Sequence, residues 1–193
     1  MVRDLRTRTG ARAGHAGTLD PFATGLLLVL LGRFTKEQSR LVGLDKRYLT
    51  EIDLTRTTTT GDPEGDTLAV HPAPSPAQLE ALLERLRGEV ELRIPAASAV
   101  KIGGERSYRL HRRGEEVEMP LRRSTVHALD LVAYEEGTAT LDLLVGSGTY
   151  VRSIAAELGG HCRSLRRTEV GPFAVEDADP TRIMPTDEAL AAL

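Results

Sequence analysis

The stretch from Gly14 to Gly25 concentrates the residue types that can do chemistry. It reads GHAGTLDPFATG, and an apolar run, Leu26–Leu31, follows it directly. Glycines let a backbone approach a ligand closely, and the proline after Asp20 keeps that residue out of regular helix. A lone carboxylate beside Gly-rich backbone fits the nucleophile or base of an active site. The spacing alone is equally well explained by an ordinary turn that begins a helix.

The same string resembles motif II of the TruB-type tRNA pseudouridine synthases, Gly-His-x-Gly-Thr-Leu-Asp-Pro-x-Ala-x-Gly. In that family the aspartate is the catalytic nucleophile, which implies this role for Asp20. Three more family segments follow in the expected order, so the resemblance extends from about Arg6 to Asp177. It implies an enzyme that converts uridine to pseudouridine at position 55, in the T-loop of tRNA, without a cofactor.

The segment Lys46-Arg47-Tyr48 resembles the Lys-x-Tyr motif of the same family. The resemblance implies that Tyr48 stacks on the target base and assists proton removal. An aromatic ring at the edge of a strand can sandwich an extruded pyrimidine, and its hydroxyl can relay a proton. The alternative is a core tyrosine that packs on the sheet.

Residues 146–155, GSGTYVRSIA, resemble family motif III, Gly-x-Tyr-[Ile/Val]-Arg-[Ser/Thr]-[Ile/Leu]. The resemblance implies that Arg152 pairs with Asp20 and that Tyr150 lines the base pocket. Such a guanidinium would keep the carboxylate ionised and fix its rotamer. We expect extended backbone up to Arg152 and helix after it, because both side chains then point to one side. The alternatives are a surface charge for Arg152 and a core position for Tyr150.

Residues 165–173 resemble the family run Leu-x-Arg-x-x-x-Gly-x-Phe, whose leucine forms an apolar wall of the uracil pocket. The resemblance implies this role for Leu165, and an ordinary core leucine fits the same position equally well. Arg166 and Arg167 would meet RNA phosphate, with a plain solvated pair as the alternative.

The segment PAASAVKIGGERSY, residues 95–108, is similar to the family's Pro-x-x-Ser-Ala-x-Lys-x-x-Gly-x-x-x-Tyr sequence. In the family this sequence leads into an RNA-binding insertion called the thumb. The resemblance implies a thumb-like insertion at about residues 98–123, in which Lys101 and Arg106 contact the tRNA backbone rather than its bases. Gly103 and Gly104 fit a segment that becomes ordered on RNA.

His15 lies inside the first motif. In the family this histidine enters the T-loop and occupies the place that the flipped nucleotide vacates. A flat polar ring can stack there and offset part of the cost of unstacking. A structural or exposed histidine is the alternative. No metal site is expected, because the other histidines lack ligand spacing; they are His71, His111, His127 and His161.

Composition allows one domain with a sizeable core, since 40% of the 193 residues are hydrophobic. The single cysteine, Cys162, excludes an internal disulfide and fits a reducing cytoplasm. No apolar run reaches the ~20 residues of a membrane span. We expect a monomer. A net charge of −3 argues weakly against a nucleic-acid partner, but the arginines are segregated. They cluster at Arg3, Arg6, Arg8 and Arg12, at Arg106, Arg109, Arg112 and Arg113, and at Arg163, Arg166 and Arg167.

The elements that must position these residues favour an α+β fold. Leu26–Leu31 fits either a helix or a strand. Helices are expected over residues 3–9, 75–86, 149–159 and 187–193, and strands over residues 48–54, 124–134, 138–145 and 164–170. The family resemblance implies a mixed, mainly antiparallel sheet with flanking helices, in a single catalytic domain over residues 1–193.

The chain departs from the family pattern at both ends. Family members normally begin with a strand and a Lys-Pro-x-Gly-x-Thr-Ser segment, whereas this chain starts inside the helix that follows, so we expect the supporting strand to be missing. We also expect no C-terminal RNA-binding (PUA) domain. Two alternative functions are a non-catalytic tRNA-binding or folding module and a guide-RNA-dependent enzyme. The presence of Asp20, Tyr48 and Arg152 together argues against the binding module. The expected lack of basic tails and of a C-terminal domain argues against the guide-dependent enzyme.

Overall fold

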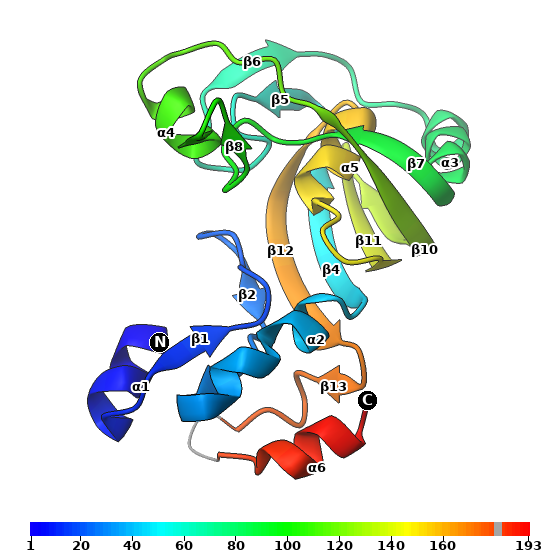
Figure 1. Ribbon diagram of the computed structural model, residues 1–193. Coiled ribbons are helices and arrows are strands. Elements are labelled where there is room, and N and C mark those ends of the chain that lie inside the picture. Colours follow the sequence, from blue (N-terminus) through cyan, green and yellow to red (C-terminus); the bar gives the residue numbers. More distant parts are fainter. Residues whose placement is uncertain (180–182) are drawn as a thin grey trace.

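The computed structural model describes residues 1–179 and 183–193 and shows a single α+β domain (Figure 1). The helices are α1 (Val2–Thr9), the 3₁₀ helix η1 (Gly32–Glu37), α2 (Gln38–Val42), α3 (Pro76–Arg85), α4 (Ser107–Arg112), α5 (Val151–Glu157) and α6 (Thr186–Ala191). The strands are β1 (Ala13–His15), β2 (Thr24–Gly25), β3 (Val29–Leu31), β4 (Lys46–Asp53), β5 (Arg56–Thr58), β6 (Thr67–Val70), β7 (Gly88–Arg93), β8 (Lys101–Ile102), β9 (Glu105–Arg106), β10 (Leu121–Glu135), β11 (Thr138–Val145), β12 (His161–Val170) and β13 (Phe173–Ala174).

In the described part of the chain the main sheet has seven strands. Six of them run in the order β13-β12-β4-β11-β10-β7, and all of these neighbours are antiparallel. The seventh, β2, pairs in parallel with β12. The expected mixed and mainly antiparallel sheet is therefore confirmed. Three two-stranded sheets, β1–β3, β5–β6 and β8–β9, lie outside it.

The hydrophobic core lies between one face of the main sheet and the helices α3 and α5. Inward side chains of β4, β11 and β12, such as Ile52, Leu141 and Cys162, are 0% exposed. Along β11 buried residues alternate with half-buried ones, so the opposite sheet face is open to solvent. On that open face Arg47 Nε donates to Asp142 Oδ1 at 2.8 Å.

A second, smaller cluster packs under the N-terminal segments. Ala16, Leu30 and Leu41 are its buried members, and Phe34 and Phe173 pack against them. Figure 1 shows this group, with α1, α2 and β13, below the main sheet, while α3 and the segment carrying α4 lie at the upper end. The strand β2 lies between the two groups and connects the N-terminal segments to the sheet through β12.

Most predicted elements are present. Ser75 begins α3 with a capping box, in which its side chain accepts from Gln78 N–H, and Gly10 ends α1 in the left-handed conformation at φ 64°. The expected hairpin joins β10 to β11 at Glu136 and Gly137, both with positive φ. The ambiguous run Leu26–Leu31 contributes the strand β3.

Candidate active site

Asp20 and Arg152 form a two-pronged ion pair. Arg152 Nε donates to Asp20 Oδ2 at 2.9 Å, and Arg152 Nη2 donates to Asp20 Oδ1 at 2.8 Å. The Arg152 side chain is 2% exposed, whereas the Asp20 side chain is 27% exposed. Two parallel N–H···O bonds fix the plane of the carboxylate as well as its position. The carboxylate is thus held in one orientation and still reaches solvent.

The same guanidinium holds two further parts of the chain. Nη1 donates to the carbonyl of Thr60 at 2.7 Å, and Nη2 donates to the carbonyl of Ala97 at 3.0 Å. Thr60 belongs to the β5–β6 turn, and Ala97 precedes the segment predicted to be thumb-like. Arg152 therefore connects Asp20 to the β5–β6 turn and to the residue that precedes the thumb-like segment.

Asp62 supplies a second carboxylate to this guanidinium. Its Oδ2 lies 3.8 Å from Arg152 Nη1, and its side chain is 7% exposed. Asp62 Oδ1 also accepts from the Thr60 hydroxyl at 2.5 Å and from the Glu64 N–H at 3.0 Å. The turn is anchored to the sheet as well, because Cys162 N–H donates to Gly61 O at 3.0 Å. Asp62 and its turn thus fix Arg152 from the side opposite Asp20.

The loop that carries Asp20 is connected directly to the main sheet. Gly25 and Arg167 face each other in the parallel β2–β12 pairing, and Leu26 N–H donates to Arg167 O at 2.8 Å. Gly25 has φ +100°, and a Cβ there would lie 2.1 Å from Arg167 O. Only glycine fits a backbone approach this close. The C-terminal end of the loop is therefore fixed on the strand that also holds Leu165.

Tyr48 lies on β4, opposite Arg167 of β12 in the strand register. Its ring is 9% exposed and packs in the main core. Burial raises the pKa of the phenol, the charge of Arg167 and a hydrogen bond from it lower the pKa, and the nearby Asp20 carboxylate raises it. The net direction is upward, so the hydroxyl stays protonated near neutral pH. The ring is therefore a core residue, and the Asp20 carboxylate lies near enough to act on its hydroxyl; the stacking role stays a prediction.

The backbone around Arg152 differs from the prediction. Tyr150 is extended, with φ −98° and ψ 117°, and caps α5, which begins at Val151. The expectation of extended backbone up to Arg152 is wrong, because Arg152 is the second residue of the helix. Helix geometry turns the two side chains apart, so Arg152 is buried while Tyr150 stays half-buried. Leu165 is 5% exposed and packs in the main core, opposite Thr50.

His15 ends β1, next to the loop that carries Asp20. Its backbone carbonyl accepts from Gln38 Nε2 at 2.8 Å. Its Nδ1 is buried, and the described residues give this atom no hydrogen-bond partner. A buried ring nitrogen without a partner is uncommon in folded proteins.

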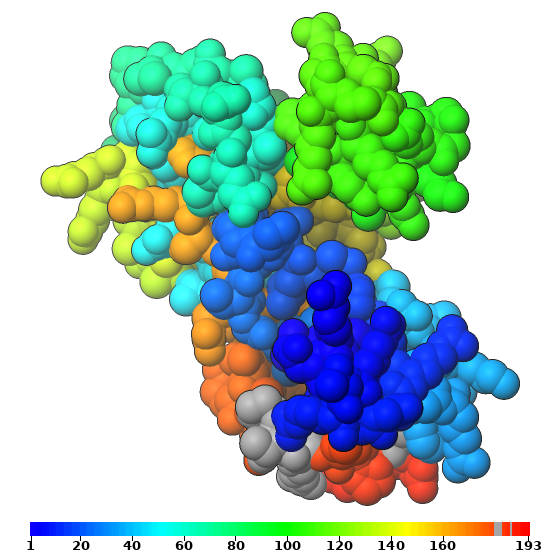
Figure 2. Space-filling model, turned by 90° about the vertical axis from the view of Figure 1, so that its left-hand side faces the viewer, coloured from blue at the N-terminus to red at the C-terminus, as the bar shows by residue number. Residues whose placement is uncertain are grey.

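The predicted RNA contacts are exposed. Lys101 lies on β8, Arg106 on β9 and Arg166 on β12. Arg106 donates through Nη1 to the Ala99 carbonyl. Figure 2 shows the green segment with β8, β9 and α4 and the teal segment with β5 and β6 above the blue N-terminal segments, on one side of the molecule. The last residues predicted for the thumb-like segment, 121–123, begin β10 and pair with β7.

Arg166 and Arg167 behave differently although they are adjacent. Arg166 is exposed, whereas Arg167 is 1% exposed. The expectation that Arg167 meets phosphate or solvent is wrong, because the register of β12 on β4 turns its side chain inward. The sequence analysis also missed Asp62 as a partner of Arg152; the only local signal was an acid within the Gly-containing turn, residues 59–65.

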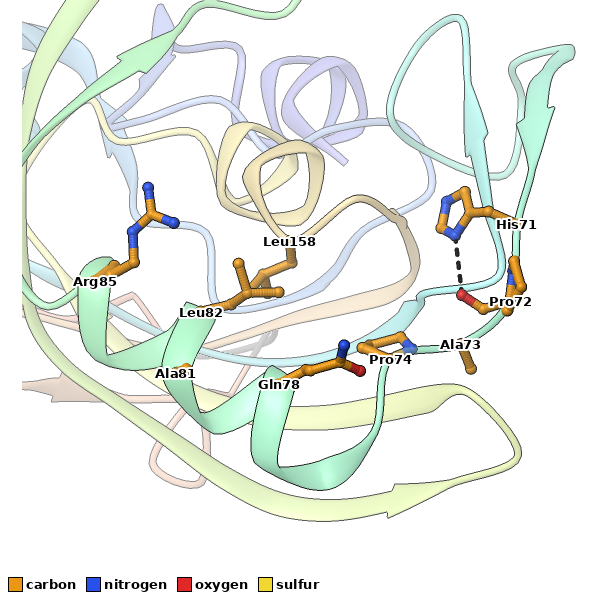
Figure 3. Close-up of a pocket in the computed structure, with 9 residues that line it drawn as sticks. All are labelled: His71, Pro72, Ala73, Pro74, Gln78, Ala81, Leu82, Arg85 and Leu158. Atoms are coloured by element: carbon orange, nitrogen blue, oxygen red, sulfur yellow. Dashed lines mark hydrogen bonds between the residues drawn. The ribbon is translucent and has the colours of Figure 1, made fainter.

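No group of three or more His, Cys, Asp or Glu side chains in the described ranges could hold a metal ion. No helix among the described residues is long and apolar enough to cross a bilayer. A hollow of about 560 Å³ lies away from the candidate site, between residues 71–74, the α3 helix and Leu158, which follows α5 (Figure 3). None of the predicted site residues lines it.

Comparison with known proteins gives one consistent family. Residues 4–151 match the family described as TruB family pseudouridylate synthase (N terminal domain). A protein of Corynebacterium diphtheriae named tRNA pseudouridine synthase B is 39% identical over 213 residues, which cover 97% of this chain and 70% of that protein. A protein of Bordetella avium with the same name is 38% identical and covers 92% of this chain and 77% of its own length.

The fold is also shared with solved structures. A chain in the structure titled "Crystal Structure of a Cbf5-Nop10-Gar1 Complex" superposes with a TM-score of 0.67 at 26% identity, over 90% of this chain and 45% of that chain. A chain in "Structure of H/ACA RNP bound to a substrate RNA containing 2'-deoxyuridine" superposes with a TM-score of 0.65 at 22% identity, which supports the fold alone. This chain thus spans about half the length of these structural relatives.

Proposed function

Since this chain belongs to the TruB family of pseudouridylate synthases, we propose that it isomerises uridine to pseudouridine in tRNA, at position 55 of the T-loop, with Asp20 as the catalytic carboxylate. The observation that carries the proposal is the ion pair of Asp20 and Arg152 at 2.8 and 2.9 Å, with the carboxylate accessible to a substrate.

The reaction needs few chemical groups. The C1′–N1 glycosidic bond breaks, a C1′–C5 bond forms, the C5 proton leaves and N1 gains a proton. No electrons are exchanged with a second molecule, so the balance needs no redox partner. Positive charge develops at C1′ as the bond to N1 breaks, and an anionic carboxylate stabilises that charge. Both electrostatic assistance and covalent attack by Asp20 require the ionised carboxylate that the Arg152 guanidinium faces.

The remaining site residues would hold the base. Tyr48, Tyr150 and Leu165 provide aromatic and apolar surface of the kind that binds a flipped pyrimidine. Keeping the detached uracil enclosed while it turns replaces a bimolecular encounter by an intramolecular one. His15 would fill the stack that the uridine leaves.

RNA contacts would lie on the side of the molecule seen in Figure 2. Residues 98–123 form the thumb-like segment in this proposal. Lys101, Arg106 and Arg166 are exposed and would bind phosphates of the T-arm, which positions the RNA without reading its sequence. One chain holds every residue of the candidate site, and we propose that it acts as a monomer in the cytoplasm.

Asp20→Asn provides the direct test. The amide keeps the size of the carboxylate but removes its charge, so turnover of an unmodified tRNA transcript should fall by about 10⁴-fold or more while tRNA binding persists. Tritium release from C5-labelled uridine measures turnover, and filter binding measures Kd. Asp142→Asn is the matched control, because Asp142 pairs with Arg47 on the open sheet face; its turnover should equal the wild-type value.

The alternative function is a non-catalytic tRNA-binding or folding module with the same surface. It predicts tRNA binding by the wild-type chain without any pseudouridine. Wild-type turnover that Asp20→Asn leaves intact would instead remove Asp20 from the chemistry. Turnover without added guide RNA would exclude a guide-dependent enzyme.

A further inference from the structure

We infer that Arg167 is a positioning residue, which fixes both ends of the loop carrying Asp20 and the Tyr48 hydroxyl relative to one another. The inference rests on the proposed function, because it names what holds the catalytic groups of that site. The loop is defined here as residues 17–26 and is called the Asp20 loop.

The Arg167 side chain reaches both ends of the Asp20 loop. Its Nε donates to Leu26 O at 2.7 Å, and its Nη2 donates to Gly17 O at 3.2 Å. The Arg167 backbone carbonyl also accepts from Leu26 N–H at 2.8 Å. Arg167 thus makes three hydrogen bonds to Gly17 and Leu26, the two ends of the loop that carries Asp20. Because both ends of the loop bond to this one side chain, a change in its position moves the two ends relative to each other.

The same guanidinium also lies near the Tyr48 phenol: burial raises the pKa of this group, and the positive charge of Arg167 acts in the opposite direction and lowers it. Tyr48 is the β4 residue opposite Arg167, so the contact follows from the strand register. Arg152 fixes the carboxylate of Asp20, but none of its recorded bonds reaches Tyr48. Arg167 thus lies beside Tyr48 in the strand register and also bonds to both ends of the Asp20 loop.

The surroundings of Arg167 argue against a purely stabilising role. Its side-chain hydrogen bonds go to Leu26 O and Gly17 O, and both acceptors are neutral. The positive charge of Arg167 also lowers the pKa of buried Lys46, so two cations lie close together. Burying an arginine without a carboxylate costs free energy, and an apolar side chain often stabilises such a position better. The benefit of the arginine lies in its rigid fork of donors, which reaches both ends of the Asp20 loop at once.

Arg167→Met tests the inference, since methionine is apolar and flexible enough to fill the space. We expect the single-turnover rate of pseudouridine formation to fall about 10²-fold, as expected for a small misplacement of reacting groups, with Kd for tRNA within twofold of wild type. Spectrophotometric titration, with Tyr48→Phe as reference, should show the Tyr48 phenol ionising at higher pH in Arg167→Met than in wild type. Arg167→Lys, which keeps the charge but not the fork, should recover part of the rate.

Arg87→Met is the matched control for lost stability. Arg87 is also partly buried and donates to a carbonyl, that of Leu129, at 3.1 and 2.8 Å, but away from the Asp20 loop. It should lose stability and keep the wild-type rate. A wild-type rate in Arg167→Met would overturn the inference. An equal rate loss in Arg87→Met at equal stability would overturn it as well. If Arg167→Met does not fold, Arg167→Lys is measured in its place. If wild type makes no pseudouridine, the proposed function fails, whereas the Tyr48 titration still reports on Arg167.

Discussion

Two arginines are buried among the residues that the structure describes, and their surroundings are opposite. Arg152, 2% exposed, faces the carboxylates of Asp20 and Asp62, whereas Arg167, 1% exposed, bonds to neutral oxygens and lies near the charge of Lys46. In the first region carboxylates balance the charge of the guanidinium. In the second region only the arrangement of its hydrogen-bond donors is used. The difference separates two requirements of an active site, which are a charge in the right place and a backbone that keeps it there.

Replacing Arg152 by lysine should give the largest effect on the charge-matched region. Lysine keeps the positive charge but is a point donor, so it cannot hold both Asp20 oxygens and the carbonyls of Thr60 and Ala97. We expect kcat to fall on the order of 10²–10³-fold. Steady-state kinetics on a tRNA transcript measures the change. A rise in KM with unchanged kcat would show that Arg152 only binds substrate.

Gly25→Ala disturbs the geometry of the second region without touching any charge. The new Cβ would lie 2.1 Å from Arg167 O and 2.8 Å from Arg167 N, so the backbone of the Asp20 loop must move. We expect a rate loss of about 10²-fold and a loss of about 3 kcal/mol in unfolding free energy. Gly88→Ala is the control, because Gly88 has φ +85° but nothing within 4 Å of its Cβ. It should cost about 1 kcal/mol and leave the rate unchanged; equal rates in the two variants would contradict this account.

Lys46→Met should give the smallest effect, and it tests the second region through the pH dependence of stability. Burial and the charge of Arg167 lower the pKa of Lys46 to about 8, from the usual 10.5. Between these two values the unfolded chain binds more protons than the folded chain, so the contribution of Lys46 to stability rises with pH. We expect wild type to gain on the order of 2 kcal/mol relative to Lys46→Met between pH 7 and pH 10.5. Urea unfolding at several pH values measures this difference, and a difference that stays constant with pH would show that Lys46 titrates normally.

Local signals explain why much of the fold could be predicted. The capping box at Ser75 and the positive-φ turn at Glu136 and Gly137 depend on neighbouring residues only, and both elements appear where expected. The pairing of β2 with β12 joins Thr24 to Arg166 across most of the chain, so no local pattern could reveal it. The helix α5 starts at Val151, two residues earlier than expected. The prediction relied on the alternation of Tyr150 and Arg152 and not on a capping signal.

The candidate site shows the same division. The family resemblance pointed to Asp20 and Arg152, and the structure joins them by two hydrogen bonds. Sequence alone could not separate Arg166 from Arg167, since which of two adjacent strand residues turns inward depends on the register with β4. Asp62 could not be assigned for a related reason: its approach to Arg152 depends on how the β5–β6 turn folds over α5.

Chemical labelling of Cys162 can report how often this chain opens. The thiol is 0% exposed, burial raises its pKa to about 12, and the strand that bears it also carries Leu165 and Arg167. Alkylating reagents attack the thiolate, so the folded chain should resist them almost completely. The rate of labelling therefore measures how often β12 separates from β4. If tRNA slows the labelling, the tRNA binds the closed form.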